Sequence, residues 1–77
     1  MEEVLNMKRV PVQSSNIASV GYDPASSTLE IEFHSGGVYQ YSGVSSEVYE
    51  GLMKASSKGS YFHHNIKMAG YPFKRMR

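Results

Sequence analysis

Thr28-Leu29-Glu30-Ile31-Glu32-Phe33-His34 is the stretch of this sequence that decides the fold. The side chains of Leu29, Ile31 and Phe33 fall on one side of an extended chain, and the polar side chains between them fall on the other. A strand buried on both faces would not alternate apolar residues with acids. The pattern therefore predicts a β-sheet with one covered face and one open face.

Turn-forming residues flank this strand and predict an antiparallel meander. Before it, Asp23-Pro24-Ala25-Ser26-Ser27 combines an aspartate that can accept from the backbone two residues on with a proline that fixes its own φ angle. After it, Ser35-Gly36-Gly37 supplies residues that tolerate positive φ in a tight hairpin. We expect three strands, at about 16–22, 28–34 and 38–42.

The residues that follow predict two helices. Val48, Leu52 and Ala55 have the spacing of one apolar helical stripe, which indicates a helix at about 46–56. Ser45 or Ser46 can cap its first turn. A second short helix is expected at about 60–67. The predicted fold class is α+β, a three-stranded antiparallel meander packed by these helices.

The joint between the two helices contains four small or basic residues, Ser57-Lys58-Gly59-Ser60. Gly59 is expected to end the first helix in the left-handed conformation, and Ser60 is expected to cap the second. The same residues can hold an anion or serve only as a turn between helices. Both interpretations stay open at the level of sequence.

The length of 77 residues is that of one domain. We expect a flexible leader at 1–11, a single domain at 12–73 and a basic tail at 74–77. A strand containing Pro11 would have to be an edge strand, because proline has no N–H to donate. The sequence has no cysteine, no apolar run long enough to span a membrane and no signal-peptide pattern. These features favour a cytoplasmic location with no membrane contact.

Charge is distributed unevenly along the chain. Residues 1–50 hold seven acids and two bases, whereas residues 51–77 hold six bases and no acid. Such a division can mark a surface that binds polyanions, or it can mean that the two halves neutralise each other in the fold. The second interpretation is slightly favoured for a domain of this size.

From about Val12 to Lys67 the sequence resembles the KTSC domain family. The resemblance is carried by the order and spacing of several short motifs: Ser14-Ser15-Asn16-Ile17, Gly21-Tyr22-Asp23, Leu29-x-Ile31-x-Phe33, Tyr39-Gln40-Tyr41, Val44-x-x-x-Val48-Tyr49 and Ala55-Ser56-Ser57-Lys58-Gly59-Ser60-Tyr61-Phe62. The resemblance implies a domain that occurs alone in bacterial and phage proteins and at the C-terminus of some lysyl-tRNA synthetases. It implies no assigned activity, and it favours RNA or tRNA as a partner.

Tyr39 and Tyr41 correspond to the family's Tyr-x-Tyr signature, and hairpin register decides which face they occupy. If residues 35–37 form a three-residue loop, Tyr39 lies opposite Phe33 and both rings join the covered face. If the turn has two residues, both rings form an exposed pair that can stack on nucleic-acid bases. The covered face is favoured, because a thin core needs aromatic side chains.

The leading functional hypothesis is a small non-enzymatic accessory domain that binds RNA or another nucleic acid through its basic C-terminal half. Its candidate binding residues are Tyr39, Tyr41, Lys54, Lys58, Lys67, Lys74 and Arg75. The alternative is a protein-interaction module that docks a partner or itself through a sheet edge or the open face.

No pattern in the sequence predicts catalysis or a metal site. The serine pairs lie outside known nucleophile motifs, and a domain this small has little room for an enclosed substrate pocket. His63 and His64 are adjacent in sequence, which is not a chelating spacing on a helix, and His34 would have to join them from the sheet. We therefore expect no enzyme activity, no cofactor, no metal and no small-molecule substrate.

Overall fold

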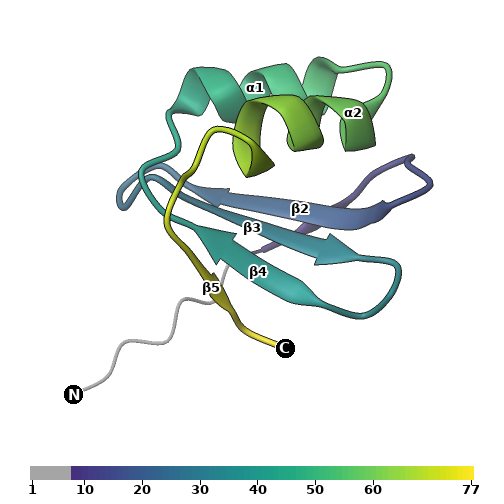
Figure 1. The fold of residues 1–77 in the computed structure, drawn as a ribbon, viewed down its shortest axis with the longest axis horizontal. Coiled ribbons are helices and arrows are strands. Elements are labelled where there is room, and N and C mark those ends of the chain that lie inside the picture. Colours follow the sequence, from purple (N-terminus) through teal and green to yellow (C-terminus); the bar gives the residue numbers. More distant parts are fainter. Residues whose placement is uncertain (1–7) are drawn as a thin grey trace.

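The computed structural model describes residues 8–77, which form one antiparallel sheet with helices over one of its faces (Figure 1). The strands follow one another across the sheet in the order β1-β2-β3-β4-β5. The elements in chain order are β1 (Val10–Pro11), β2 (Ile17–Asp23), β3 (Thr28–Phe33), β4 (Val38–Tyr41), α1 (Ser46–Lys54), α2 (Lys58–Phe62), the π-helical turn η1 (His63–Lys67) and β5 (Phe73–Arg75).

The α+β class and the central meander β2-β3-β4 are confirmed, but the predicted number of strands is wrong. The sheet has five strands, because β1 pairs with β2 and β5 returns after the helices to pair with β4. These two strands are two and three residues long, too short to show alternation in the sequence. Pro11 lies on an edge strand, as its missing N–H requires. Residues 1–7 of the expected leader lie outside the described residues.

The core lies between the sheet and the helices. Leu29 and Ile31 from β3 are fully buried there, as are Leu52 from α1 and Ile66 from η1. Val20 from β2 lies opposite Ile31 and is also fully buried. The alternation in β3 therefore predicted the covered face correctly.

The β3–β4 hairpin places Tyr39 opposite Ile31 and Tyr41 opposite Leu29. Both rings consequently lie on the helix-covered side, which confirms the favoured alternative. The predicted pairing of Tyr39 with Phe33 is wrong by two residues, because the three-residue loop is 34–36 and not 35–37. Its third residue, Gly36, has a φ of 105°, and loops of this length need positive φ there. A shift of two residues leaves each side chain on its face.

A bulge in β2 brings Ile17 into the core. Ile17 pairs with Phe33 and Ser19 pairs with Glu32, so Ala18 is an extra residue between consecutive pairs. Without that extra residue, Ile17 would share the open face with Ser19. Ser14 holds the preceding loop, because its Oγ accepts from the N–H groups of Asn16 and Ile17, both at 3.2 Å.

The end of α1 and the start of α2 differ from the prediction, whereas the start of α1 agrees with it. Ser45 caps α1 by accepting from the N–H of Val48 at 3.3 Å, in agreement with one of the two predicted caps. The cap of α2 is Ser57 and not Ser60, and Gly59 lies inside α2 without a positive φ. The first helix instead ends at Ala55 in an extended conformation. No helix within residues 8–77 has the length and apolar character needed to cross a membrane.

Gly51 in α1 gives room to the ring of Tyr61 in α2. A Cβ atom at position 51 would lie 2.8 Å from Cζ of Tyr61, whose hydroxyl donates to the carbonyl of Val48 at 3.1 Å. Gly51→Ala is therefore expected to lower the free energy of unfolding by about 1 to 2 kcal/mol, although alanine is the better helix former. Urea denaturation measures the effect, with the exposed Glu50→Ala as control. Unchanged or increased stability of Gly51→Ala would contradict this packing.

Candidate nucleic-acid interface

A groove of about 800 Å³ opens between the helix-side face of the sheet and the α2–η1 segment, and we call it the aromatic groove. Strands β4 and β5 supply part of its wall, and α2, η1 and the chain after them supply the opposite part. Its lining residues are Asn16, Ile17, Phe33, Ser35, Tyr39, Tyr41, Gly59, Phe62, His63, Lys67, Gly70, Tyr71 and Phe73. Six of the thirteen are aromatic, which makes the groove a candidate binding site for planar groups.

Five of these rings form a continuous cluster. Phe73 lies 5.9 Å from Tyr39 and 5.6 Å from Tyr41 between ring centroids, while Tyr39 and Tyr41 are 6.5 Å apart with their planes 28° from parallel. Phe62 packs edge-to-face on both Tyr41 and Phe33, at 5.5 and 5.4 Å. The edge-to-face contacts hold the inner rings in fixed orientations.

The rings differ in how far they are accessible. Tyr41 is 7% exposed and belongs to the core, Tyr39 is half-buried, and Phe73 is 63% exposed. Burial raises the pKa of the Tyr41 phenol, and the neighbouring Tyr39 raises it further, so this hydroxyl stays neutral at physiological pH. Phe33 and Tyr71 are half-buried like Tyr39, so a ligand can reach Phe73 most fully and these three rings in part.

Positive charge lies beside these accessible rings. Lys67 lines the groove from η1, and the guanidinium carbon of Arg75 lies 5.7 Å from the centroid of the Tyr39 ring. A cation at that distance over an aromatic face is attracted by the ring. Among residues 8–77, none of those that line the groove is acidic. The groove thus combines aromatic surface with a positive border.

Four of the seven residues predicted to bind nucleic acid come together at this groove: Tyr39, Tyr41, Lys67 and Arg75. The other three lie elsewhere. Lys58 lines a neighbouring polar hollow, Lys54 lies in the last turn of α1, and Lys74 pairs with Gln40, on the strand positions that face away from the helices.

Phe62 and His63 were not recognised from the sequence as site residues. The sequence shows Phe73 and Tyr71 only as aromatic residues interleaved with the basic tail. The pairing of β4 with β5, which brings Phe73 to the groove, is not visible in the sequence. The three histidines do not converge, since Nε2 of His34 lies 2.9 Å from the carbonyl oxygen of Ser14. Within residues 8–77, no three side chains of metal-binding type gather.

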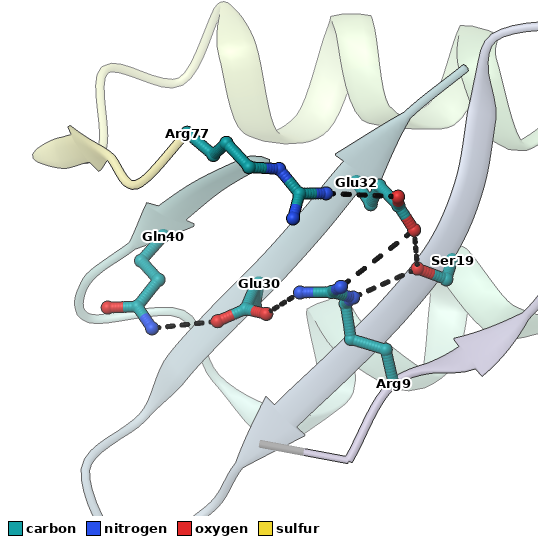
Figure 2. Close-up of polar contacts among 6 residues, drawn as sticks. All are labelled: Arg9, Ser19, Glu30, Glu32, Gln40 and Arg77. Carbon is teal, nitrogen blue, oxygen red and sulfur yellow. Dashed lines mark hydrogen bonds and ion pairs between the residues drawn. The ribbon is translucent and has the colours of Figure 1, made fainter. Parts of the chain in front are cut away.

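The open face of the sheet carries a polar network, drawn in Figure 2, that satisfies its acids internally. Glu30 is only 6% exposed; it pairs with Arg9 and accepts from Nε2 of Gln40 at 2.8 Å. Glu32 accepts from the hydroxyl of Ser19 at 2.7 Å and lies 3.4 Å from Arg77. We call these six residues the open-face network: Arg9, Ser19, Glu30, Glu32, Gln40 and Arg77.

This network also answers the question of charge neutralisation. Arg77 from the basic half pairs with Glu32 from the acidic half, but Arg9, which lies in the acidic half, supplies the other pairs. Among residues 8–77, Lys54, Lys58, Lys67, Lys74 and Arg75 take part in no ion pair. Within the described residues, neutralisation across the two halves is therefore partial.

The pKa of Glu32 should make stability depend on pH. The hydroxyl of Ser19 lowers this pKa from 4.5, burial opposes it, and the charges of Arg9, Arg77 and His34 lower it further. Because the folded state favours the carboxylate, its contribution is present above about pH 4.5 and is lost as pH falls through the lowered pKa. In Ser19→Ala, the urea midpoint is expected to fall less between about pH 7 and pH 3 than in the wild type. An equal fall in both proteins would contradict this assignment.

Comparison with known proteins identifies the family. A small α+β domain of this form, with a five-stranded sheet and helices on one face, matches the KTSC domain over residues 13–71. The chain belongs to the KTSC domain family. It is 44% identical over 70 residues to an uncharacterised protein of Stutzerimonas stutzeri strain A1501, which covers 91% of this chain and 99% of that protein.

Two further relatives show the range of proteins in which the domain occurs. A crystal structure of a KTSC domain protein from Yersinia pestis is 42% identical, has a TM-score of 0.87 and is covered to 99%, with 92% of this chain matched. A lysine–tRNA ligase of Nostoc sp. strain PCC 7120 is 39% identical over 67 residues. That match covers 87% of this chain but only 12% of the ligase.

Proposed function

We propose that this KTSC domain is a non-enzymatic module that binds single-stranded nucleic acid, RNA in particular, in the aromatic groove. The observation that carries the proposal is the position of Tyr39 and Phe73, which are 5.9 Å apart and accessible, with Arg75 over the Tyr39 ring and Lys67 in the lining of the same groove. Single-strand binders use this combination of aromatic rings and positive charge.

The rings supply affinity that tolerates many sequences. Every base has a flat π face, and stacking on one aromatic side chain contributes about 1 to 3 kcal/mol per base. In A-form duplex RNA the bases are already stacked on one another, whereas those of a single strand can be separated. The groove is therefore suited to single strands more than to duplexes.

The bordering cations supply attraction to phosphate. Within residues 8–77, neither Lys67 nor Arg75 pairs with an acidic side chain, and none of the residues lining the groove is acidic. Nε of Arg75 donates to the carbonyl oxygen of Arg77 at 3.1 Å, which leaves the two terminal nitrogens of its guanidinium to donate to a phosphate. The acids of β3 lie on the other face and are engaged by Arg9 and Arg77. A strand that follows the groove would avoid them.

The lysine–tRNA ligase relative supports RNA over other polyanions. By its name that protein acts on tRNA, and it contains a segment 39% identical to this chain. The segment is 12% of its length, so the ligase activity itself is not transferred to this domain. What the relative supports is the presence of the same fold in a protein that handles RNA.

The test is a fluorescence-anisotropy titration with a labelled single-stranded RNA of about ten nucleotides, at about 50 and 300 mM KCl. Binding is expected at low salt, with an affinity that falls at high salt by a logarithmic slope of about 0.7 for each phosphate contacted. A duplex of the same sequence should bind more weakly. Absence of binding at low salt, or binding indifferent to salt, would refute the proposal.

The second candidate is a protein-interaction module, favoured by exposed apolar side chains near the C-terminus. Phe73 is 63% exposed, Met68 68% and Met76 48%. The two sheet edges offer few backbone groups for pairing, since β1 has two residues and β5 three. Light scattering tests self-association, and concentration-dependent dimers that bury Phe73 would favour this candidate over RNA.

A further inference from the structure

The aromatic groove contains a side chain whose charge can change near neutral pH, the imidazole of His63. His63 is the first residue of η1, is exposed, and lines the groove four residues before Lys67. Histidine is the side chain whose ordinary titration range falls between about pH 5 and pH 8. The positive charge that borders the groove is therefore not fixed, because it includes a group that gains or loses a proton in this range.

The ring of His63 differs from those of the other two histidines in its partners. Nε2 of His34 lies 2.9 Å from the carbonyl oxygen of Ser14, and Nδ1 of His64 lies 3.0 Å from the carbonyl oxygen of Ser60. Neither of these two histidines lines the groove. In the part of the chain that the structure describes, no hydrogen bond or ion pair engages the ring nitrogens of His63. Both nitrogens can therefore turn to a ligand in the groove.

The groups that surround His63 are positive or uncharged at neutral pH. Lys67 adds a positive charge from η1 itself, and the ring of His64 lies edge-to-face at 5.2 Å. The ionisable groups that the other elements bring to the groove are Tyr39 and Tyr41 from β4, Tyr71 from the segment after η1, and Arg75 from β5.

The remaining ionisable groups of the neighbouring elements point elsewhere. In α2, Lys58 donates to the carbonyl of Ala55 at 3.0 Å and Tyr61 donates to that of Val48 at 3.1 Å. The acids of β3, Glu30 and Glu32, belong to the open-face network on the other side of the sheet. Among the described residues no acid lines the groove, so a bound phosphate would be the negative group that favours a proton on His63.

We infer that His63 makes strand binding in the aromatic groove depend on pH, with its protonated ring serving as an additional phosphate contact. The inference rests on the proposed function for the identity of the ligand. A protonated imidazole carries one positive charge and donates from both nitrogens, whereas the neutral ring donates from one. Its charge-assisted hydrogen bond to a phosphate oxygen is the stronger one. Since the strand favours the protonated ring, affinity rises as pH falls through the titration range of histidine.

The test is a fluorescence-anisotropy titration of the whole chain with a labelled single-stranded oligouridine, at about pH 5.8 and about pH 7.8 and equal ionic strength. Uracil and the phosphodiester group keep their charge between these two values, so a change in affinity comes from the protein. The wild type is expected to bind roughly three- to tenfold more tightly at the lower pH. Its logarithmic salt slope should be steeper there by about 0.7, which corresponds to one more phosphate contact.

Three variants assign this dependence to one ring. His63→Gln removes the titrating charge and should lose most of the difference between the two pH values. His63→Lys keeps a positive charge at both values and should bind tightly at both, which a folding defect would not produce. His64→Gln is the matched control, because His64 is exposed and adjacent but does not line the groove, and it should keep the wild-type dependence.

The outcomes separate this inference from the proposed function. Equal affinity of the wild type at the two pH values, or a dependence that His63→Gln retains, would refute the role of His63 and leave the proposed function standing. Loss of the dependence in His64→Gln to the same extent as in His63→Gln would also refute it. Absence of binding at both pH values and low salt would refute the proposed function, and this inference with it.

Discussion

Replacing Arg9 with methionine is expected to lower the free energy of unfolding by about 2 to 4 kcal/mol. Arg9 pairs with the buried carboxylate of Glu30, and its Nε donates to the hydroxyl of Ser19 at 3.0 Å. Without the guanidinium, the amide of Gln40 would be the one side-chain partner left to Glu30 among residues 8–77. Breaking a buried pair costs more than the pair contributes, because a desolvated charge remains. A domain of this length has a total stability of roughly 4 to 11 kcal/mol, so the loss would be large.

Methionine is the replacement of choice because it keeps the aliphatic packing of Arg9. A Cβ atom at Gly21 would lie 3.1 Å from Cγ of Arg9, which shows how closely this side chain crosses β2. The effect is measured by urea denaturation in the single variants Arg9→Met and Glu30→Gln and in the double variant. The double variant should lose less stability than the two single losses added together. Additive losses, or an Arg9→Met protein within 0.5 kcal/mol of the wild type, would show that the pair is not important.

Phe73→Ala and Tyr39→Leu are each expected to weaken binding of single-stranded RNA by about 5- to 100-fold, which corresponds to one stacked base. Phe73 is exposed, so its truncation should leave the fold intact. Tyr39 is half-buried, and leucine retains apolar volume at its position. Tyr41 is unsuitable for this experiment, since it is 7% exposed and belongs to the core.

Two controls separate stacking from other effects. Met68→Ala removes an exposed apolar side chain that lines neither hollow, and it should leave RNA affinity unchanged. Tyr39→Phe keeps the ring and should bind nearly as well as the wild type. Equal losses in Phe73→Ala and Met68→Ala would mean that the rings act only through general hydrophobicity, which would contradict the stacking account.

The central meander could be predicted from the sequence, because local signals there agree with one another. Alternation in β3 gave the covered face, and a glycine-rich loop gave the hairpin. The exact loop residues could not be predicted, since both Gly36 and Gly37 tolerate positive φ and only Gly36 adopts it. Strand β5 could not be predicted, because it exists only through its pairing with β4. The helices separate these two strands in the sequence, so no local pattern shows the pairing.

Gly51 illustrates a different limit. The sequence pattern places Gly51 on the polar side of the first helix, whereas in the structure the ring of Tyr61 packs against it. The apolar periodicity of one helix does not show which residues of a neighbouring helix pack against it. The bulge at Ala18 was missed for a similar reason, because only the pairing partner reveals the extra residue.

The candidate site could be predicted in part. Tyr39, Tyr41, Lys67 and Arg75 were expected from their residue types, and the fold brings them to one groove. From the sequence we considered only two alternatives, in which both tyrosines are in the core or both are exposed. In the structure Tyr41 is buried while Tyr39 is half-buried, so the two tyrosines differ in accessibility. Both tyrosines share one face and line the groove, but Tyr41 is buried at its base whereas Tyr39 is only half-buried.

NMR mapping of single-stranded RNA on the protein tests the central claim most directly. We predict that the largest shifts fall on signals of Tyr39, Lys67, Phe73 and Arg75. Signals of Glu30 and Gln40 on the open face should move little. Shifts concentrated on the open-face network, or an unchanged spectrum at saturating RNA and low salt, would contradict the account.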